Sequence, residues 1–132
     1  MDELMRPLLS RTFLSGILIF ASAASFATEL KVPIMERASD GLDTCALGEV
    51  TDLKTGGDGF LAVRSGPGTE YEKIDEIFNG DRVWMFEQKG HWIGVAYGSD
   101  AITCSPISID HPLDKPGKKG WVHENWIKII AG

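Results

Sequence analysis

The sequence predicts an all-β protein, a small antiparallel β-barrel or sandwich, and three observations support this prediction. Short apolar stretches recur along the chain after its first third, and glycine-containing turns separate them. No stretch has the 3.6-residue apolar period of an amphipathic helix. About six short strands at such close spacing are typical of a small barrel or sandwich.

The predicted strands are separated by turns that can be read from the sequence. Asn79-Gly80 is a strong signal for a hairpin turn, and Lys89-Gly90 marks a second hairpin. Pro67-Gly68 fits the centre of a type II turn, in which the glycine takes a positive φ. The strands are therefore expected at residues 45–53, 60–65, 73–78, 81–88 and 91–97, with a closing stretch at residues 120–130.

One predicted strand carries an aromatic pair that needs cover. If Val83 and Met85 face the core, side-chain alternation directs Trp84 and Phe86 to the opposite face of the strand. That aromatic face is either an exposed patch or is covered by another segment of the chain. The N-terminal extension and the long segment that precedes the closing stretch are the two candidates for this cover.

The first 27 residues have the layout of a secretory signal peptide. Arg6 and Arg11 precede a stretch without charge at residues 13–26, and the small residues Ser25 and Ala27 occupy the cleavage positions. A retained membrane anchor is the alternative, but the apolar stretch is shorter than the ~20 residues that a spanning helix needs.

We therefore expect an exported protein, periplasmic or secreted, that touches the membrane only through its signal peptide before cleavage. Cleavage is expected after Ala27 or Ala23. Residues 28–44 then form an N-terminal extension, which has no clear period and is expected to be a linker or a loosely docked strand.

The two cysteines, Cys45 and Cys104, both follow the predicted signal peptide. An even number of cysteines in an exported chain indicates a disulfide. The chain-entropy model assigns about 4 kcal/mol to a bond that closes a loop of this length. A metal pair and a catalytic thiol are the alternatives, but two cysteines without histidines at ligand spacing make a poor zinc site.

The net charge of −6 argues against nucleic acid as a partner, because phosphate binding needs a basic patch. The one basic cluster, residues 115–119, is too small to reverse this and is expected to be a solvated loop. No cofactor and no metal are expected, since His91, His111 and His123 do not lie at metal-ligand spacing.

Several short motifs stand in a characteristic order. Val63 to Pro67 end one strand, the Lys73-Ile74 strand follows, and Gly80-Asp81 open the strand after it. Gly90-x-Trp92 and finally Gly120-Trp121-Val122 complete the order. Their order and spacing resemble those of bacterial SH3-like (SH3b) domains, over about residues 50–130. The resemblance implies a small, partly open antiparallel β-barrel. It also implies structural roles for the motif residues Arg64, Gly66, Pro67, Gly80, Trp92, Gly120 and Trp121.

The resemblance further implies a function. Members of this family occur in exported bacterial proteins, often as modules that bind peptidoglycan or its cross-bridge peptides. We therefore expect residues 45–132 to form a non-catalytic barrel that binds peptidoglycan or another wall-associated ligand. The alternative is a periplasmic inhibitor or immunity protein that occludes an enzyme through its long loop, since an acidic surface suits a basic wall-degrading enzyme.

The long loop, residues 98–119, departs from the family pattern, in which a short loop reaches the Gly-Trp-Val motif. Loops of this length are usually functional or disordered, and the cysteine within it argues against disorder. The aromatic groove of eukaryotic SH3 domains, which binds polyproline, cannot be recognised in the sequence. We expect ligand contacts on the long loop and the aromatic residues near it, namely Trp84, Phe86, Tyr97, Asp110, His111 and Trp126.

Overall fold

The computed structural model of the protein describes residues 16–17, 29–54 and 59–132. Apart from residues 16–17, the predicted signal peptide lies outside the described residues. Within the described ranges, no helix is long and apolar enough to cross a membrane.

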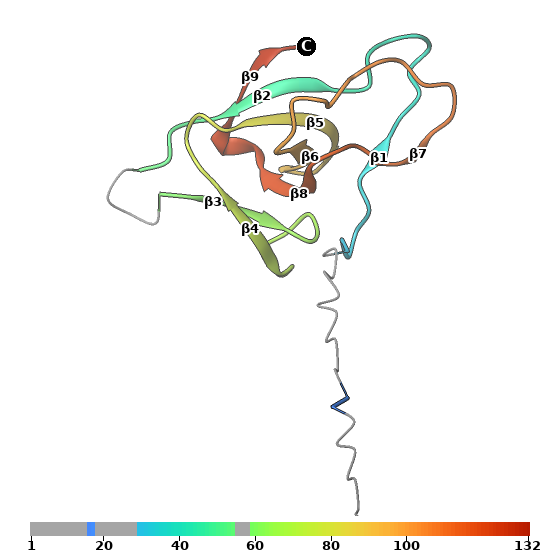
Figure 1. Cartoon of the computed structure of the whole chain (residues 1–132). Coiled ribbons are helices and arrows are strands. Elements are labelled where there is room, and N and C mark those ends of the chain that lie inside the picture. Colours follow the sequence, from blue (N-terminus) through green and yellow to red (C-terminus); the bar gives the residue numbers. More distant parts are fainter. Residues whose placement is uncertain (1–15, 18–28, 55–58) are drawn as a thin grey trace, which may run out of the picture.

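The described part of the chain is all-β, as predicted. Seven strands form one antiparallel sheet in the order β4-β3-β8-β6-β5-β2-β9, and β1 pairs with β7 in a separate two-stranded sheet. The large sheet curls into a partly open barrel with β4 and β9 at its two edges (Figure 1). The elements are β1 (Met35–Glu36), β2 (Ala46–Val50), β3 (Leu61–Arg64), β4 (Lys73–Ile77), β5 (Arg82–Lys89), β6 (Trp92–Tyr97), β7 (His111–Pro112), β8 (Lys118–His123), the 3-10 helix η1 (Glu124–Trp126) and β9 (Ile127–Ala131).

The predicted strands agree with the observed ones to within a few residues. The hairpin at Lys89-Gly90 is confirmed, because Lys89 pairs with Trp92 across β5 and β6. The long loop ends earlier than predicted. Lys118 and Lys119 already belong to β8, where they pair with the end of β6.

The turn at Asn79-Gly80 forms, but the two strands that it joins do not pair with each other. Gly80 has a φ of 91°, and the N–H of Asp81 donates to the carbonyl of Phe78 at 2.9 Å. The N–H of Gly80 also donates to the carbonyl of Val50 at 2.8 Å, which holds the turn against the end of β2. β4 pairs with β3 instead, and β5 pairs with β2 and β6, so the predicted hairpin is wrong here.

The predicted type II turn at Pro67-Gly68 is also wrong. Gly68 is not among the residues with positive φ, and its N–H donates to the carbonyl of Gly66 at 3.0 Å, the i to i+2 bond of a γ-turn. The ring of Tyr71 lies so close to Gly66 that a Cβ there would collide with it. The close approach of the Tyr71 ring at this corner therefore requires a residue without a Cβ at position 66.

The barrel encloses a first hydrophobic core, which alternate residues of its strands supply. Val83 contributes to this core and Met85 packs against it, as the alternation predicted. The buried members are Val50, Leu61, Val63, Ile77, Val83, Ile93, Val95, Tyr97 and Val122.

A second hydrophobic core lies on the opposite face of β5 and β6. Phe86 is buried in it and Trp84 packs against it. Both candidate segments supply the cover: Ile34 comes from the N-terminal extension, and Ile102 and Leu113 come from the long loop. Of the two alternatives that the sequence left open, the structure shows the covered face.

The N-terminal extension is tightly packed rather than loosely docked. Its side chains alternate, and those of one face turn toward the second core. The side chain of Ile34 lies directly over Gly94 of β6, and the indole Nε1 of Trp121 donates to the carbonyl of Val32 at 2.9 Å. The inward-facing positions are Leu30, Val32, Ile34 and Glu36.

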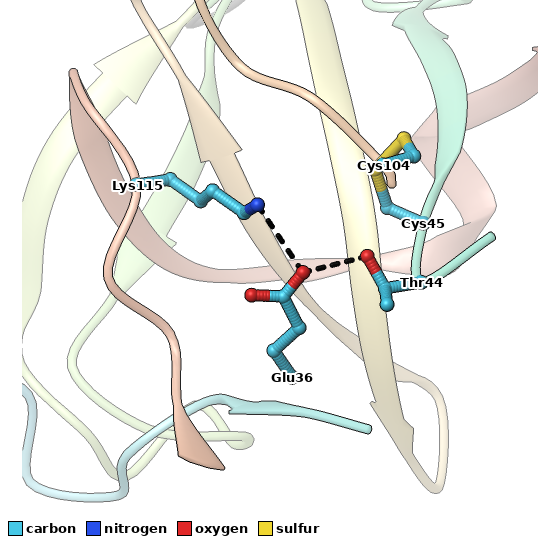
Figure 2. The surroundings of a disulfide bond; sticks show 5 residues. All are labelled: Glu36, Thr44, Cys45, Cys104 and Lys115. Atoms are coloured by element: carbon cyan, nitrogen blue, oxygen red, sulfur yellow. Dashed lines mark hydrogen bonds and ion pairs between the residues drawn. A yellow bond between two sulfur atoms is a disulfide. The ribbon is translucent and has the colours of Figure 1, made fainter. Parts of the chain in front are cut away.

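The disulfide between Cys45 and Cys104 is present and joins the start of β2 to the long loop. Beside it, the carboxylate of Glu36 accepts a hydrogen bond from Thr44 Oγ1 at 2.6 Å and lies 3.2 Å from Lys115 Nζ. Figure 2 shows these contacts next to the two sulfur atoms. The extension, the barrel and the long loop thus converge at one point.

Candidate ligand-binding site

An open groove of about 610 Å³ lies where the turn after β4 approaches the segment that follows β6. We call it the acidic groove. Four carboxylates and two cationic side chains line it, which leaves it with an excess of negative charge. Its lining is formed by Asp75–Phe78, Gly80–Arg82, Trp84, Tyr97–Asp100 and Lys118.

Asp75 and Tyr97 form the fixed inner part of the acidic groove. The hydroxyl of Tyr97 donates to Asp75 Oδ2 at 2.8 Å, and Lys118 Nζ lies 3.4 Å from the same oxygen. Burial alone would raise the pKa of Asp75, but the N–H of Glu76, the Tyr97 hydroxyl and the Lys118 ammonium together lower it. Burial, with Asp75 next to it, raises the pKa of Tyr97, so its hydroxyl stays a donor.

The outer part of the acidic groove has polar groups that are free for a ligand. Asp100 and Arg82 form no ion pair with any other residue that the structure describes. Asp81, in contrast, accepts the N–H of Phe78 at 2.8 Å and holds the turn. The side chain of Phe78 is 51% exposed and forms an apolar rim. The groove can therefore take a ligand that has both an ammonium group and an apolar part.

The sequence-predicted ligand residues are dispersed over the structure. Trp84 and Tyr97 both line the acidic groove. Phe86 is buried in the second core, with Lys115 Nζ 5.8 Å from its ring centre. Trp126 lies on η1, beside a different and smaller hollow.

Asp110 and His111 lie together on the long loop, where they hold the N-terminal extension. Asp110 accepts the N–H of Ala38 at 2.7 Å and pairs with Arg37 at 3.4 Å. The N–H of Ala38, with Arg37 nearby, lowers the pKa of Asp110. The Nε2 of His111 lies 3.7 Å from the buried Glu36 carboxylate. In the structure these two residues contact the rest of the chain rather than the acidic groove.

The motif residues lie at turns, close contacts and strand pairs. Arg64 pairs with Trp121 across β3 and β8, and its Nη1 donates to the carbonyl of Tyr71 at 2.9 Å. Trp121 is fully buried, and a Cβ at Gly120 would collide with Val63. Gly66 and Pro67 form the corner described above, Gly80 the turn after β4, and Trp92 the start of β6.

Sequence reasoning missed the polar residues of the acidic groove, Asp75, Asp81, Arg82, Asp100 and Lys118. A signal for Asp75 was available, because side-chain alternation puts it on the same face of β4 as the buried Ile77. Asp100 and Lys118 come together only because β6 and β8 are neighbours in the sheet. No group of three or more His, Cys, Asp or Glu side chains in the described ranges is arranged to hold a metal ion.

The small, partly open curled sheet has the architecture of an SH3-like β-barrel. The family model of the bacterial SH3 domain matches residues 59–128, so the chain belongs to the bacterial SH3 domain family. Domains of this family are generally cell-wall binding modules without catalytic activity, and they are typically extracellular or wall-associated. No curated protein and no solved structure matches the chain.

Proposed function

We propose that this protein is an exported, non-catalytic module that binds peptidoglycan through the acidic groove. The observation that carries the proposal is the groove itself, in which Asp100, without an ion pair to any residue that the structure describes, and exposed Phe78 line the same wall as Trp84 and Tyr97. The peptides of peptidoglycan present amines next to small apolar side chains. A negatively charged groove with an apolar rim is complementary to such a peptide.

A sedimentation assay tests this function. The full chain is mixed with purified peptidoglycan and centrifuged, and the bound fraction is measured. We expect the wild type to sediment and the variant Phe78→Ser to lose most of this binding. Ile109→Ser is the matched control, because Ile109 is even more exposed (74%) but lies on the long loop. Wild-type protein that stays in the supernatant overturns the proposal.

The charge of the groove has its own test. Asp100→Asn removes one free carboxylate, and we expect it to weaken peptidoglycan binding roughly two- to fivefold, the usual range for an exposed charge pair. Asp114→Asn removes a carboxylate from the long loop outside the groove and is the matched control. Equal binding by both variants would show that the groove charge does not take part.

The second candidate function, inhibition of a periplasmic enzyme, has one observation in its favour. Ile109 projects from the long loop beside a shallow hollow that Pro106, Ile107 and Ala38 help to line. An exposed apolar tip of this kind suits a protein partner. If Ile109→Ser abolishes the co-purification of one partner protein while Phe78→Ser does not, the inhibitor function replaces the wall-binding function.

Deletion of the whole long loop does not serve as a test. Ile102 and Leu113 of this segment are buried in the second core, and Lys118 and Lys119 belong to β8. Removing residues 98–119 would therefore expose the second core and break the sheet. Single substitutions at the tip avoid this problem.

Export is the remaining part of the proposal. It rests on the layout of residues 1–27. The mass of the protein recovered from outside the cytoplasm tests it, and we expect a chain that begins at Thr28 or Ala24. A full-length mass in that fraction would contradict cleavage.

A further inference from the structure

A second hollow, of about 270 Å³, lies at the junction of β3, β6 and η1. We call it the aromatic hollow. Aromatic side chains dominate its walls, which include Phe60, Trp92, His123 and Trp126, together with Arg64 and Thr69. No carboxylate lines it, although the protein as a whole has a net charge of −6.

Arg64 and His123 supply hydrogen-bond donors to the aromatic hollow. Arg64 forms no ion pair with any other residue in the described part of the chain, and its Nε is buried without an acceptor. Buried donors are usually paired, so an unpaired one calls for an explanation. A ligand oxygen near this guanidinium would accept a hydrogen bond from it.

His123 adds a second donor. Its Nδ1 accepts the N–H of Asn125 at 3.2 Å, so the neutral ring carries its proton on Nε2. The ring also meets Trp92 edge-on, with centroids 5.4 Å apart. Two contacts therefore fix the orientation of this imidazole.

We infer that the aromatic hollow binds a pyranose ring of a glycan. The face of a sugar ring is apolar and packs on indole and phenyl rings, while its hydroxyl and acyl oxygens are acceptors for donors such as Arg64 and His123. The size of the hollow suits a single ring, since it lies below the 300–1,000 Å³ range typical of sites for larger ligands. A polyproline peptide would need a longer strip of successive pockets.

The position of the aromatic hollow relative to the acidic groove fits a composite ligand. Ala62 of β3 lines the hollow, and Glu76 of β4 lines the groove. These two residues are direct partners across the β3–β4 ladder. A ligand with a sugar ring and an amine-bearing peptide can therefore occupy both sites. This part of the inference rests on the proposed function, whereas sugar binding by the hollow does not.

Titration of the full chain with tri-N-acetylglucosamine tests the inference. The nuclear magnetic resonance signals of the indole Nε1–H groups report on each tryptophan of the wild type. We expect the signals of Trp92 and Trp126 to shift on titration and that of fully buried Trp121 to stay in place. No shift at Trp92 and Trp126 overturns the inference, and this readout does not depend on any variant.

Trp126→Ala is the matching variant, and we expect it to weaken sugar binding roughly tenfold. Asp114→Asn, at an exposed position outside both sites, is expected to bind the trisaccharide like the wild type. If Trp126→Ala proves unstable, Thr69→Val, which removes only an exposed hydroxyl, should weaken binding about twofold. Equal binding by wild type and every folded variant of the hollow would overturn the inference.

Two further outcomes separate this inference from the proposed function. Protein that sediments with peptidoglycan but does not bind the trisaccharide retains the function and overturns the sugar site. Protein that binds the trisaccharide but does not sediment with peptidoglycan retains the sugar site and overturns the function. Binding of a proline decapeptide in place of the sugar, with shifts at the same two indoles, would also overturn the inference.

Discussion

The ammonium group of Lys115 lies 3.2 Å from Oε2 of Glu36, a carboxylate whose side chain is only 1% exposed (Figure 2). One partner comes from the long loop and the other from the N-terminal extension. Together, Lys115 and Thr44 give the buried Glu36 side chain two polar partners on the same oxygen.

Lys115→Met should therefore destabilise the protein. It leaves the buried Glu36 carboxylate without its lysine partner and with His111 Nε2 3.7 Å away as the remaining basic group, and the loss of a buried partner of this kind typically costs about 3 kcal/mol. Urea unfolding measures the loss, and Lys89→Met at an exposed position is the control. Glu36→Gln in the Lys115→Met background should recover part of the loss, because it removes the uncompensated charge. Equal stability of the two lysine variants would contradict this account.

Removal of the disulfide should lower the free energy of unfolding by about 4 kcal/mol, an upper-end figure from the entropy of a closed loop. The variant Cys45→Ser/Cys104→Ser should also bind a hydrophobic dye, because the long loop then covers the second core less firmly. Urea unfolding and dye fluorescence check both effects. Reductant should lower the free energy of unfolding of the wild type and leave that of the double variant unchanged. If reductant does not change the wild-type value, the result contradicts the disulfide.

The stability of the protein should fall at acid pH, in part through Asp75. Its pKa is lowered in the folded state, so its contribution is present above the unfolded pKa of about 3.9 and is lost as the pH falls through the folded pKa. Urea unfolding between pH 2 and 7 measures this. Asp75→Asn should make the free energy of unfolding depend less on pH below about pH 4. If the free energies of variant and wild type fall in parallel with pH, Asp75 does not have this role.

Tyr97→Phe should act through the same contact. It removes the donor to Asp75 Oδ2 and should cost about 1 kcal/mol, the usual net value of a hydrogen bond. A double-mutant cycle with Asp75→Asn isolates the interaction. Strictly additive losses would mean that the two side chains do not interact in solution.

Gly94→Ala should loosen the N-terminal extension. A Cβ at this position would lie 2.8 Å from Cγ1 and Cγ2 of Ile34, and overpacking of this kind typically costs about 1–3 kcal/mol. Ile34→Ala alone should cost about 3 kcal/mol through the lost burial. Urea unfolding of the double variant should show a loss smaller than the sum, because the shorter side chain makes room for the new methyl group.

The sequence was sufficient to predict the barrel because its strands have clear side-chain alternation and its motifs stand in family order. It did not predict which strands meet at Asn79-Gly80, since the hydrogen bonds from this turn to Val50 come from a distant strand. The close docking of the extension could have been predicted. Leu30, Val32 and Ile34 alternate like a strand, although Pro33 interrupts the stretch.

The candidate site was harder to predict than the fold. Trp84 and Tyr97 were predicted as ligand contacts because the chain has many large aromatic side chains for its length. Both line the acidic groove, and their role as ligand contacts stays a prediction. Asp100 and Lys118 belong to segments whose proximity depends on the β6–β8 pairing, which the local sequence does not encode. Phe86 is aromatic, like many ligand-binding residues, so its residue type does not distinguish a ligand contact from a core residue. Only the structure shows that other segments cover it in the second core.

The charged side chains of β4, two of which line the acidic groove, also lie at an edge of the barrel sheet. β4 is an edge strand, and its outer row of backbone groups is available to any other extended chain. Lys73, Asp75 and Glu76 crowd this edge with charge, which discourages strand addition and aggregation. Substitutions that make the acidic groove more apolar would change its ligand preference. They would thus also remove charges that prevent a strand of a neighbouring molecule from pairing with β4.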